Sequence, residues 1–362
     1  MSYIHSKSKE IKMLKPIEYE DMPIDKLKNL EAKNSNLHRA SKAKEDEFYT
    51  QLTDIENELK HYKEHFKGKT VYCNCDDPFV SNFFRYFSYN FEHLGLKKLI
   101  ATCYRSQVTD LFSQNNSEQA ICLTYTGDKD GNGIPDISEI NITSLDGDGD
   151  FRSTECIELL KQADIVVTNP PFSLFREYVA QLIEYEKSFL VVGSQNAITY
   201  KEIFSLIRDN RLWLGHKSGD MKFKVPSHYA PRETRYWQDE TGQKWRSLGN
   251  ICWFTNLEHA KRHEELILYR TYNAQDYPKY DNYNAININK VVDIPCDYDG
   301  AMGVPITFLD KYNPKQFEII SSNDYRVNES IPFKEHGLIK DKDGAINGKP
   351  TYARILIRNR LL

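Results

Sequence analysis

The sequence contains no run of about 18–20 consecutive apolar residues, so we expect no helix that spans a membrane. The residues after Met1 pass into a lysine-rich stretch without an apolar segment of signal-peptide length. The seven cysteines are scattered, and the one close pair, Cys73 and Cys75, is not part of a metal-type spacing. These absences argue against a disulfide framework and a structural zinc site, and they predict a soluble protein of the reducing cytoplasm.

An overall excess of positive charge is also lacking. The formal net charge is -4, which excludes a protein that coats nucleic acid through its bulk charge. Any contact with nucleic acid would therefore come from Lys and Arg side chains gathered on one face. The 362 residues, of which 40% are hydrophobic, suffice for one large domain with an extension or for two domains.

Short apolar runs alternate with helical patterns along the middle of the chain. Strands without polar alternation, separated by helices, indicate an α/β fold with a mainly parallel sheet that is covered on both faces. Ligands bind such sheets at the carboxyl ends of the strands, so functional residues should follow the apolar runs. The predicted strands are 70–73, 99–102, 165–168, 189–192 and 212–214, and the predicted helices between them are 81–91, 175–183 and 200–207.

A longer amphipathic helix is predicted before the first strand. Its apolar residues recur at spacings of three and four, which places them on one face of a helix over 48–66. Gly68 supplies the stop signal at the carboxyl end. The residues of this face are Phe48, Leu52, Ile55, Leu59, Tyr62 and Phe66.

The segment 124–149 interrupts the rhythm with polar turn residues. Asp128, Asp130, Asn132 and Asp136 have the alternating spacing of a calcium loop, and Glu139 falls at its twelfth position. The match is partial in its glycine and apolar positions. We therefore interpret the segment as a solvated hairpin or loop insertion, and we predict no metal site.

Asn169, Pro170, Pro171 and Phe172 directly follow the apolar run at 165–168, at the end of a predicted buried strand. The amino nitrogen of adenine is a poor nucleophile because its lone pair is delocalised into the ring. An Asn oxygen and a backbone carbonyl can accept its two hydrogens and direct the lone pair toward an incoming methyl group. The prolines fix the backbone and remove two N–H donors, so this tetrapeptide suits methylation of a planar amine.

Phe172 offers a ring on which a flipped-out base can stack, because the target atom is inaccessible within a duplex. The structural alternative for the tetrapeptide is a rigid strand-to-helix turn with Ser173 as the helix cap. Upstream, Asp150 can accept from the amino group of a cofactor adenine and Phe151 can pack on its ring. The alternative there is a simple turn in the run 146–150.

The sequence resembles the EcoRI-type N6-adenine DNA methyltransferases of restriction–modification systems from about residue 40 to the C-terminus. The resemblance implies a Rossmann-like methyltransferase fold, S-adenosyl-L-methionine as methyl donor and double-stranded DNA as substrate. Its most specific stretches are DEFYT at 46–50, VYCNCDDP at 71–78, GDFRS at 149–153, DIVVTNPPFSLFR at 164–176 and GVPITFL at 303–309.

The resemblance also implies roles for individual residues. Asn169 to Phe172 match the catalytic motif. The first-strand loop departs from the broader pattern because it has no glycine, and no acidic ribose ligand is evident at 101–105, so which of Asp76 and Asp77 contacts the donor is open. The residues that match donor-binding positions are Tyr49, Thr50, Asn74, Asp76, Asp77, Pro78, Asp150 and Phe151.

We expect three parts along the chain. A charged N-terminal extension covers 1–37, the methyltransferase catalytic core covers 38–215, and 216–362 holds the rest of the core sheet and a target-recognition region. Residues 216–250 are rich in Lys, Arg, Trp and Tyr. The candidate DNA contacts there, for which a solvated charged face is the alternative, are Lys222, Lys224, Arg232 and Arg235.

Two other functions are compatible with these motifs. The amine that is methylated could belong to RNA or to a protein amide, because each presents a planar amino nitrogen. The chain could also be a DNA-binding relative that has lost donor binding and catalysis. We expect a monomer, since methylation of one strand at a time needs no two-fold symmetry, and a cognate restriction endonuclease could accompany it without forming a stable complex.

Overall fold

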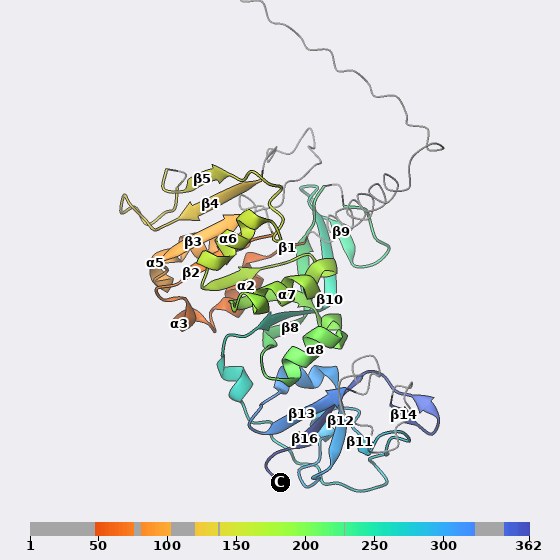
Figure 1. Ribbon diagram of the computed structural model, residues 1–362. Coiled ribbons are helices and arrows are strands. Elements are labelled where there is room, and N and C mark those ends of the chain that lie inside the picture. The colour runs from red at the N-terminus through yellow and green to blue at the C-terminus, as the bar shows by residue number, and fades with distance from the viewer. Residues whose placement is uncertain (1–47, 76–80, 103–119, 137, 228, 323–343) are drawn as a thin grey trace, which may run out of the picture. The chain divides into compact units, whose positions relative to one another are not determined.

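Four of the predicted apolar runs pair as parallel strands at the centre of the main sheet (Figure 1). In spatial order they are β3 (Lys98–Thr102), β2 (Thr70–Cys73), β6 (Ile165–Thr168) and β7 (Ser188–Ser194). Their burial on both faces explains why these runs are apolar without alternation. The four predicted strands are therefore confirmed.

The structure is a computed structural model that describes residues 48–75, 81–102, 120–136, 138–227, 229–322 and 344–362. These residues belong to one compact unit, 46–362, and a second unit, 1–45, lies outside the described residues. The predicted N-terminal extension therefore falls where nothing is described.

The sheet becomes antiparallel beyond β7. There β10 (Lys244–Thr255) pairs antiparallel with β7 and with β8 (Trp213–Lys224). Two short strands complete this side: β1 (Tyr49–Thr50) pairs antiparallel with β8, and β9 (Tyr236–Gln238) pairs antiparallel with β10. The predicted strand 212–214 is thus the first part of a strand of 12 residues.

The sheet is also antiparallel beyond β3, where β4 (Ile121–Tyr125) and β5 (Asn141–Ser144) form a hairpin. The polar segment 124–149 begins in this hairpin and extends beyond it, so its interpretation as a hairpin is confirmed as far as Ser144. Within the described residues the whole is a mixed sheet of ten strands that is parallel at its centre. The predicted Rossmann-like α/β fold is confirmed.

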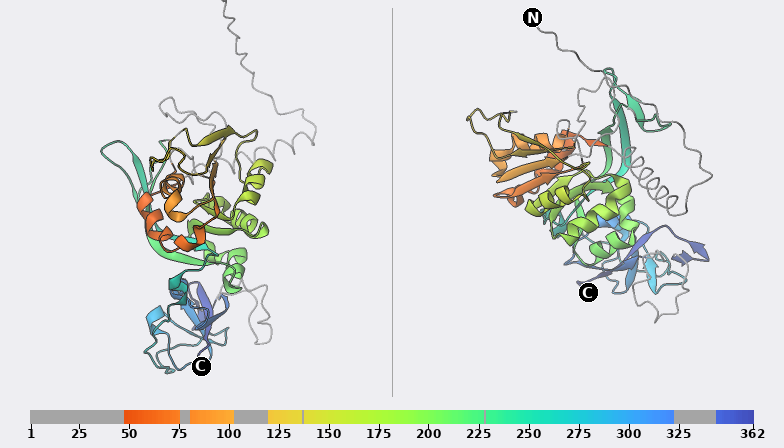
Figure 2. Two further views of the ribbon diagram at one scale, coloured as in Figure 1. Left: turned by 90° about the vertical axis from the view of Figure 1, so that its left-hand side faces the viewer. Right: turned by 45° about the horizontal axis from the view of Figure 1, so that its top comes forward.

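Helices cover both faces of this sheet (Figure 2). Tyr72 and Val166 pack with α6, α7 and α8, whereas the next residues along the strands, Cys73 and Val167, pack with α2, α3, α4 and α5 on the opposite face. The helices are α2 (Leu52–Leu59), α3 (Lys63–Phe66), α4 (Asn82–Tyr89), α5 (Phe91–Leu94), α6 (Thr154–Gln162), α7 (Phe175–Glu184) and α8 (Lys201–Arg208).

Two predicted helices are broken in the structure, which corrects both. The helix predicted over 48–66 begins only at Leu52, because residues 49–50 pair with β8 as β1, and it is interrupted between α2 and α3. The helix predicted over 81–91 is interrupted at Asn90, whose side-chain amide donates to the carbonyl of Tyr86 at 2.8 Å. Hydrophobic spacing alone carries no signal for either break.

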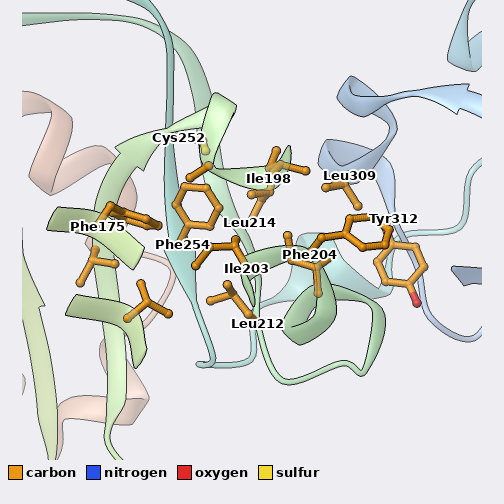
Figure 3. Close-up of a cluster of buried hydrophobic side chains, with 14 of the residues drawn as sticks. Phe175, Ile198, Ile203, Phe204, Leu212, Leu214, Cys252, Phe254, Leu309 and Tyr312 are labelled. Atoms are coloured by element: carbon orange, nitrogen blue, oxygen red, sulfur yellow. The ribbon is translucent and has the colours of Figure 1, made fainter. Parts of the chain in front are cut away.

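The C-terminal part of the chain forms a second, four-stranded sheet in the order β11-β12-β16-β13. Buried side chains from all four of these strands join those of α8 in one hydrophobic cluster, in which Phe204 lies close to Leu309 and Tyr312 (Figure 3). The division of the chain at residue 215 stays a prediction. The strands are β11 (Ala285–Asn287), β12 (Ala301–Pro305), β13 (Phe317–Ser322) and β16 (Arg354–Asn359), with a separate hairpin of β14 (Ala345–Ile346) and β15 (Lys349–Pro350).

Short 3-10 helices occupy several connections. None of the helices in the described part of the chain is long and apolar enough to cross a membrane. The 3-10 helices are η1 (Phe172–Leu174), η2 (Gln195–Thr199), η3 (Ala260–His263), η4 (Val291–Asp293) and η5 (Ile306–Lys311).

Candidate functional site

Asn74 and Asn169 follow the carboxyl ends of two neighbouring parallel strands, β2 and β6. The hydroxyl of Thr168 donates a hydrogen bond to the backbone carbonyl of Asn74, which ties the two strand ends together. Polar residues that the sequence separates by about a hundred positions are thus brought to one edge of the sheet, where ligands of α/β proteins bind.

The side chain of Asn169 is buried, with 7% of its surface exposed, and it is held in one orientation. Its Nδ2 donates to the backbone carbonyl of Phe48. A carbonyl can only accept, so the amide nitrogen must face Phe48 and Oδ1 must point the other way. Within the described residues, Oδ1 has no hydrogen-bond partner. A buried acceptor without a donor costs about 1–3 kcal/mol, so Oδ1 is suited to receive a hydrogen from a ligand.

The two prolines differ in what their carbonyls do. The carbonyl of Pro171 accepts from the backbone N–H of Leu174 at 2.9 Å and so begins η1. The carbonyl of Pro170 has no donor among the residues that the structure describes. Pro170, the residue after Asn169, therefore offers a backbone acceptor next to Asn169 in the sequence. The alternative in which Ser173 caps the helix is wrong, because Ser173 lies within η1 and α7 has no side-chain cap.

Phe172 is half-buried and stacks on Phe48, with ring centroids 5.5 Å apart and an angle of 26° between the rings. Phe48 is itself buried and also contacts Phe223 of β8 and Tyr229. The ring that the sequence assigns to base stacking is therefore supported from behind by a residue that the sequence assigned to a helix.

The predicted donor-binding residues Tyr49 and Thr50 form β1, directly after Phe48. Thr50 is 1% exposed, and its Oγ1 has no hydrogen-bond partner within the described residues. The backbone carbonyl of Thr50 accepts from the side chain of Asn82 at 2.7 Å. The structure thus brings the segment 48–50 and the predicted catalytic motif together through Phe48.

The loop after β2 is anchored by the side chain of Asn74, which is buried. The hydroxyl of Tyr178 on α7 donates to Oδ1 of Asn74. Burial raises the pKa of Tyr178, so its hydroxyl stays protonated as a donor. The next residue, Cys75, adopts a φ of 82°, the left-handed region that glycine enters most easily, and it does so in the loop where the missing glycine was noted. Asp76, Asp77 and Pro78 lie outside the described residues.

Asp150 is held by a two-pronged contact with Arg152. Nε and Nη2 of Arg152 lie 2.8 Å and 2.6 Å from the two carboxylate oxygens, and Nη1 reaches Glu177 of α7 at 3.2 Å. Burial on its own raises the pKa of the Asp150 carboxyl, but the bonds from Arg152 outweigh it and hold that pKa below its ordinary value. Asp150 is therefore a fixed, ionised acceptor.

The ring of Phe151 is buried and meets the ring of Tyr178 edge to face, with centroids 5.0 Å apart. The carbonyl of Phe151 accepts from Gln181 at 3.1 Å. Because Tyr178 also bonds Asn74, it joins two of the predicted donor-binding segments. Tyr178 and Arg152 were not predicted: Tyr178 has only the spacing of a core residue on a helix, and Arg152 looks like any exposed charge.

The four basic candidates for DNA contacts are exposed but differently placed. Lys222 and Lys224 alternate with buried residues along β8, and Nζ of Lys224 lies 5.6 Å from the ring centre of Trp245. Arg232 lies over the ring of Tyr229 at 5.6 Å. Arg235 pairs with Asp220 at 3.1 Å. Since Tyr229 contacts Phe48, this basic surface adjoins the aromatic cluster behind Phe172.

The calcium-like segment brings carboxylate oxygens of Asp128, Asp130 and Glu139 within 4.8 Å of one another. Asp128 accepts from the backbone N–H groups of Gly131 and Gly133, each at 2.7 Å, as expected of a tight polar loop. The expectation that no metal binds here stays a prediction.

Comparisons with known proteins agree on one family. The family model described as adenine-specific methyltransferase EcoRI matches residues 36–360. The Type II methyltransferase M.EcoRI of Escherichia coli is 51% identical over 335 residues, which cover 91% of this chain and 98% of that protein. The Type II methyltransferases M.MgeORF184P of Mycoplasma genitalium and M.MpnI of Mycoplasma pneumoniae are each 40% identical, over 90% and 89% of this chain and 99% and 98% of their own lengths. No solved structure matches the chain.

Proposed function

The chain belongs to the family of adenine-specific EcoRI methyltransferases, and from this premise we propose that it transfers the methyl group of S-adenosyl-L-methionine to the N6 amino group of an adenine that is flipped out of duplex DNA. The protein is an adenine-specific DNA methyltransferase of a restriction–modification system. The donor, the target atom and the residues that act on them are our proposal.

One observation carries the assignment of the reacting residues. Oδ1 of Asn169 is a buried acceptor without a donor within the described residues, at the carboxyl end of a central strand, and its orientation is fixed by the carbonyl of Phe48. The next residue, Pro170, supplies a backbone carbonyl. Two acceptors at adjacent residues are what an amino group with two hydrogens requires.

These residues act mainly by orienting the amine. When Asn169 and Pro170 accept its two hydrogens, the lone pair of the nitrogen turns out of conjugation and toward the methyl donor. Phe172 holds the plane of the base by stacking, with support from Phe48. After methyl transfer the nitrogen carries a positive charge and releases one proton to water, since the two oxygens accept hydrogen bonds but are too weakly basic to keep the proton.

Other residues of the site fit S-adenosyl-L-methionine, which supplies an electrophilic methyl group on a sulfonium. The fixed carboxylate of Asp150 suits the amino group of the donor's adenine, and the ring of Phe151 borders the same place. The buried hydroxyl of Thr50 has no partner within the described residues and suits a polar group of the donor. Tyr49, Asn74, Asp76, Asp77 and Pro78 are proposed for the donor site from the resemblance.

A Thr50→Val substitution is expected to weaken donor binding by roughly fivefold, because valine has the shape of threonine but lacks the hydroxyl, and a hydrogen bond contributes about 1 kcal/mol. The melting temperature should stay the same or rise, since a buried polar atom without a partner is removed. Calorimetric titration with S-adenosyl-L-methionine and thermal melting measure both. Unchanged donor affinity contradicts a role for this hydroxyl.

The proposed function is tested by incubating the purified protein with tritium-labelled S-adenosyl-L-methionine and duplex DNA that lacks modified bases. We expect label on N6-methyladenine after digestion of the DNA to nucleosides. RNA and protein offered in the same reaction serve as competing substrates. Absence of label on adenine while the donor binds normally, or preferential labelling of RNA or protein, contradicts the proposal.

We also propose that the exposed basic residues of 222–235 contact the phosphates of DNA, with Lys224 and Arg235 partly engaged within the protein. The observation in support is the aromatic connection from Arg232 through Tyr229 to Phe48. A Lys222→Ala, Arg232→Ala double variant should bind duplex DNA about tenfold more weakly at ~0.1 M salt and with a shallower salt dependence. A variant with Lys161→Ala on α6 is the control, and equal losses in both contradict the assignment.

We further propose that the enzyme acts as a monomer in the cytoplasm, beside a cognate restriction endonuclease with which it forms no stable complex. Its relatives are named Type II methyltransferases, and the cysteines of the described residues form no disulfide with one another. Sedimentation of the purified protein tests the first point, since a stable dimer contradicts it. Protection of methylated DNA from an endonuclease encoded beside the gene tests the second.

A further inference from the structure

Phe48 contacts the catalytic motif in two independent ways. Its backbone carbonyl accepts from Nδ2 of Asn169, and its ring stacks on Phe172 at 5.5 Å. The two contacts reach side chains with different proposed tasks. Asn169 is proposed to bind the amine by a hydrogen bond, and Phe172 is proposed to stack on the base. No other residue in the described part of the chain has contacts of both kinds with the motif.

We infer that Phe48 is a positioning residue for methyl transfer. It fixes the amide of Asn169 with Oδ1 toward the target amine, and it holds the ring of Phe172 where the base of that amine stacks. This inference rests on the proposed function of Asn169. It adds a residue that neither the sequence nor the comparisons assign to the reaction.

The position of Phe48 is itself well determined. The residue is 5% exposed, its ring is enclosed by Phe223 and Tyr229 in addition to Phe172, and the chain immediately continues into β1, which pairs with β8. A carbonyl at the start of a paired strand is held by the sheet. The sheet therefore fixes the carbonyl of Phe48, and this carbonyl fixes the orientation of the Asn169 amide.

Replacing Phe48 by a side chain that does not fill its place should slow the chemical step more than it weakens donor binding. The carbonyl of residue 48 remains in any variant, but it shifts when the ring no longer fills its place between Phe172 and Phe223. A displacement of about 1 Å in a reacting group can slow a reaction by up to about 10²-fold. Donor binding is proposed to depend on Asp150, Phe151 and Thr50. The ring of Phe151 meets Tyr178 and belongs to a different hydrophobic cluster from that of Phe48.

The test is a Phe48→Leu variant assayed at saturating donor and DNA. We expect kcat to fall by about tenfold or more, with the donor dissociation constant within threefold of the wild type. Phe48→Tyr, which keeps a flat ring, should recover most of the rate. A rate for Phe48→Leu within twofold of the wild type overturns the inference.

A matched control separates positioning from general loss of stability. Phe66 is a phenylalanine of the same hydrophobic cluster, 0% exposed, whose ring meets Phe87 and not the motif. Phe66→Leu should lower the melting temperature at least as much as Phe48→Leu and leave kcat within twofold of the wild type. Equal losses of kcat in the two variants overturn the inference as well.

A double-mutant cycle tests whether Phe48 acts through Phe172. If the stacked pair works as one unit, Phe48→Leu should reduce kcat much less in a Phe172→Leu background than in the wild type. Multiplicative losses contradict the part of the inference in which Phe48 acts through the ring of Phe172. Its failure is distinguishable from failure of the proposed function: an active wild type and an inactive Asn169→Ala variant, combined with a normal Phe48→Leu, refute the role of Phe48 alone.

Discussion

An Asn169→Ala variant is expected to bind S-adenosyl-L-methionine like the wild type and to transfer its methyl group on the order of 10²–10³-fold more slowly. Removing one group that stabilises a transition state through a preorganised hydrogen bond has an effect of this size. The bond from Oδ1 strengthens as the lone pair leaves conjugation, so its loss falls on kcat rather than on donor binding. Single-turnover rates with labelled donor and calorimetric donor titration measure the two quantities.

The stability of the Asn169→Ala variant should change little. The substitution removes the bond from Nδ2 to the carbonyl of Phe48, but it also removes a buried oxygen that has no partner within the described residues. Asn287→Ala is the matched control, because Asn287 is an equally buried asparagine in the second sheet whose Oδ1 accepts from Tyr280 at 2.8 Å. It should lose stability and keep its rate. A near-normal rate for Asn169→Ala refutes the assigned role.

An Asp150→Ala variant is expected to bind the donor about 10–100-fold more weakly, since a hydrogen bond to a charged group contributes about 1.5–3 kcal/mol. The kcat at saturating donor should fall much less, because Asp150 is proposed to hold the far end of the donor. Arg152 lowers the pKa of Asp150, so the carboxylate is ionised at neutral pH and the ion pair is lost only as the pH falls through that lowered pKa. Titration of Asp150 should therefore cause no change in donor affinity between about pH 6 and pH 8.

The control for Asp150 is Asp146→Ala, which removes an exposed carboxylate from the same acidic run. Donor titrations of the two variants at equal ionic strength compare the loss of one specific acceptor with the loss of one negative charge. If Asp146→Ala weakens donor binding as much as Asp150→Ala, the assignment of Asp150 to the donor's adenine is wrong.

Local patterns were sufficient for the elements that are buried on both faces. The runs at 70–73 and 165–168 are apolar at every position except their threonines, and both are strands with those bounds. The same patterns failed for β8, whose outer half alternates Met221, Lys222, Phe223 and Lys224. That alternation spans too few residues, after the glycines of 215 and 219, to be noticed without its partner β10.

The candidate site was predicted in part. The position of Asn169 after a buried strand indicated where it would lie, because the carboxyl ends of parallel strands share one edge of the sheet. The pairing of Arg152 with Asp150 and the bond from Tyr178 to Asn74 were not foreseen. Each depends on the rotamer and the exact approach of two segments, which residue spacing does not describe.

The sequence by itself determined the family of this protein, through its resemblance, and the order of its central elements, because strand periodicity is a local property. Only the tertiary structure decided which carbonyl orients Asn169: Phe48 is 121 residues away, and the helical spacing of its neighbours had placed it on a helix. Residues 49–50 form a strand instead of a helix, because their backbone forms its hydrogen bonds with β8, which lies far away in the chain.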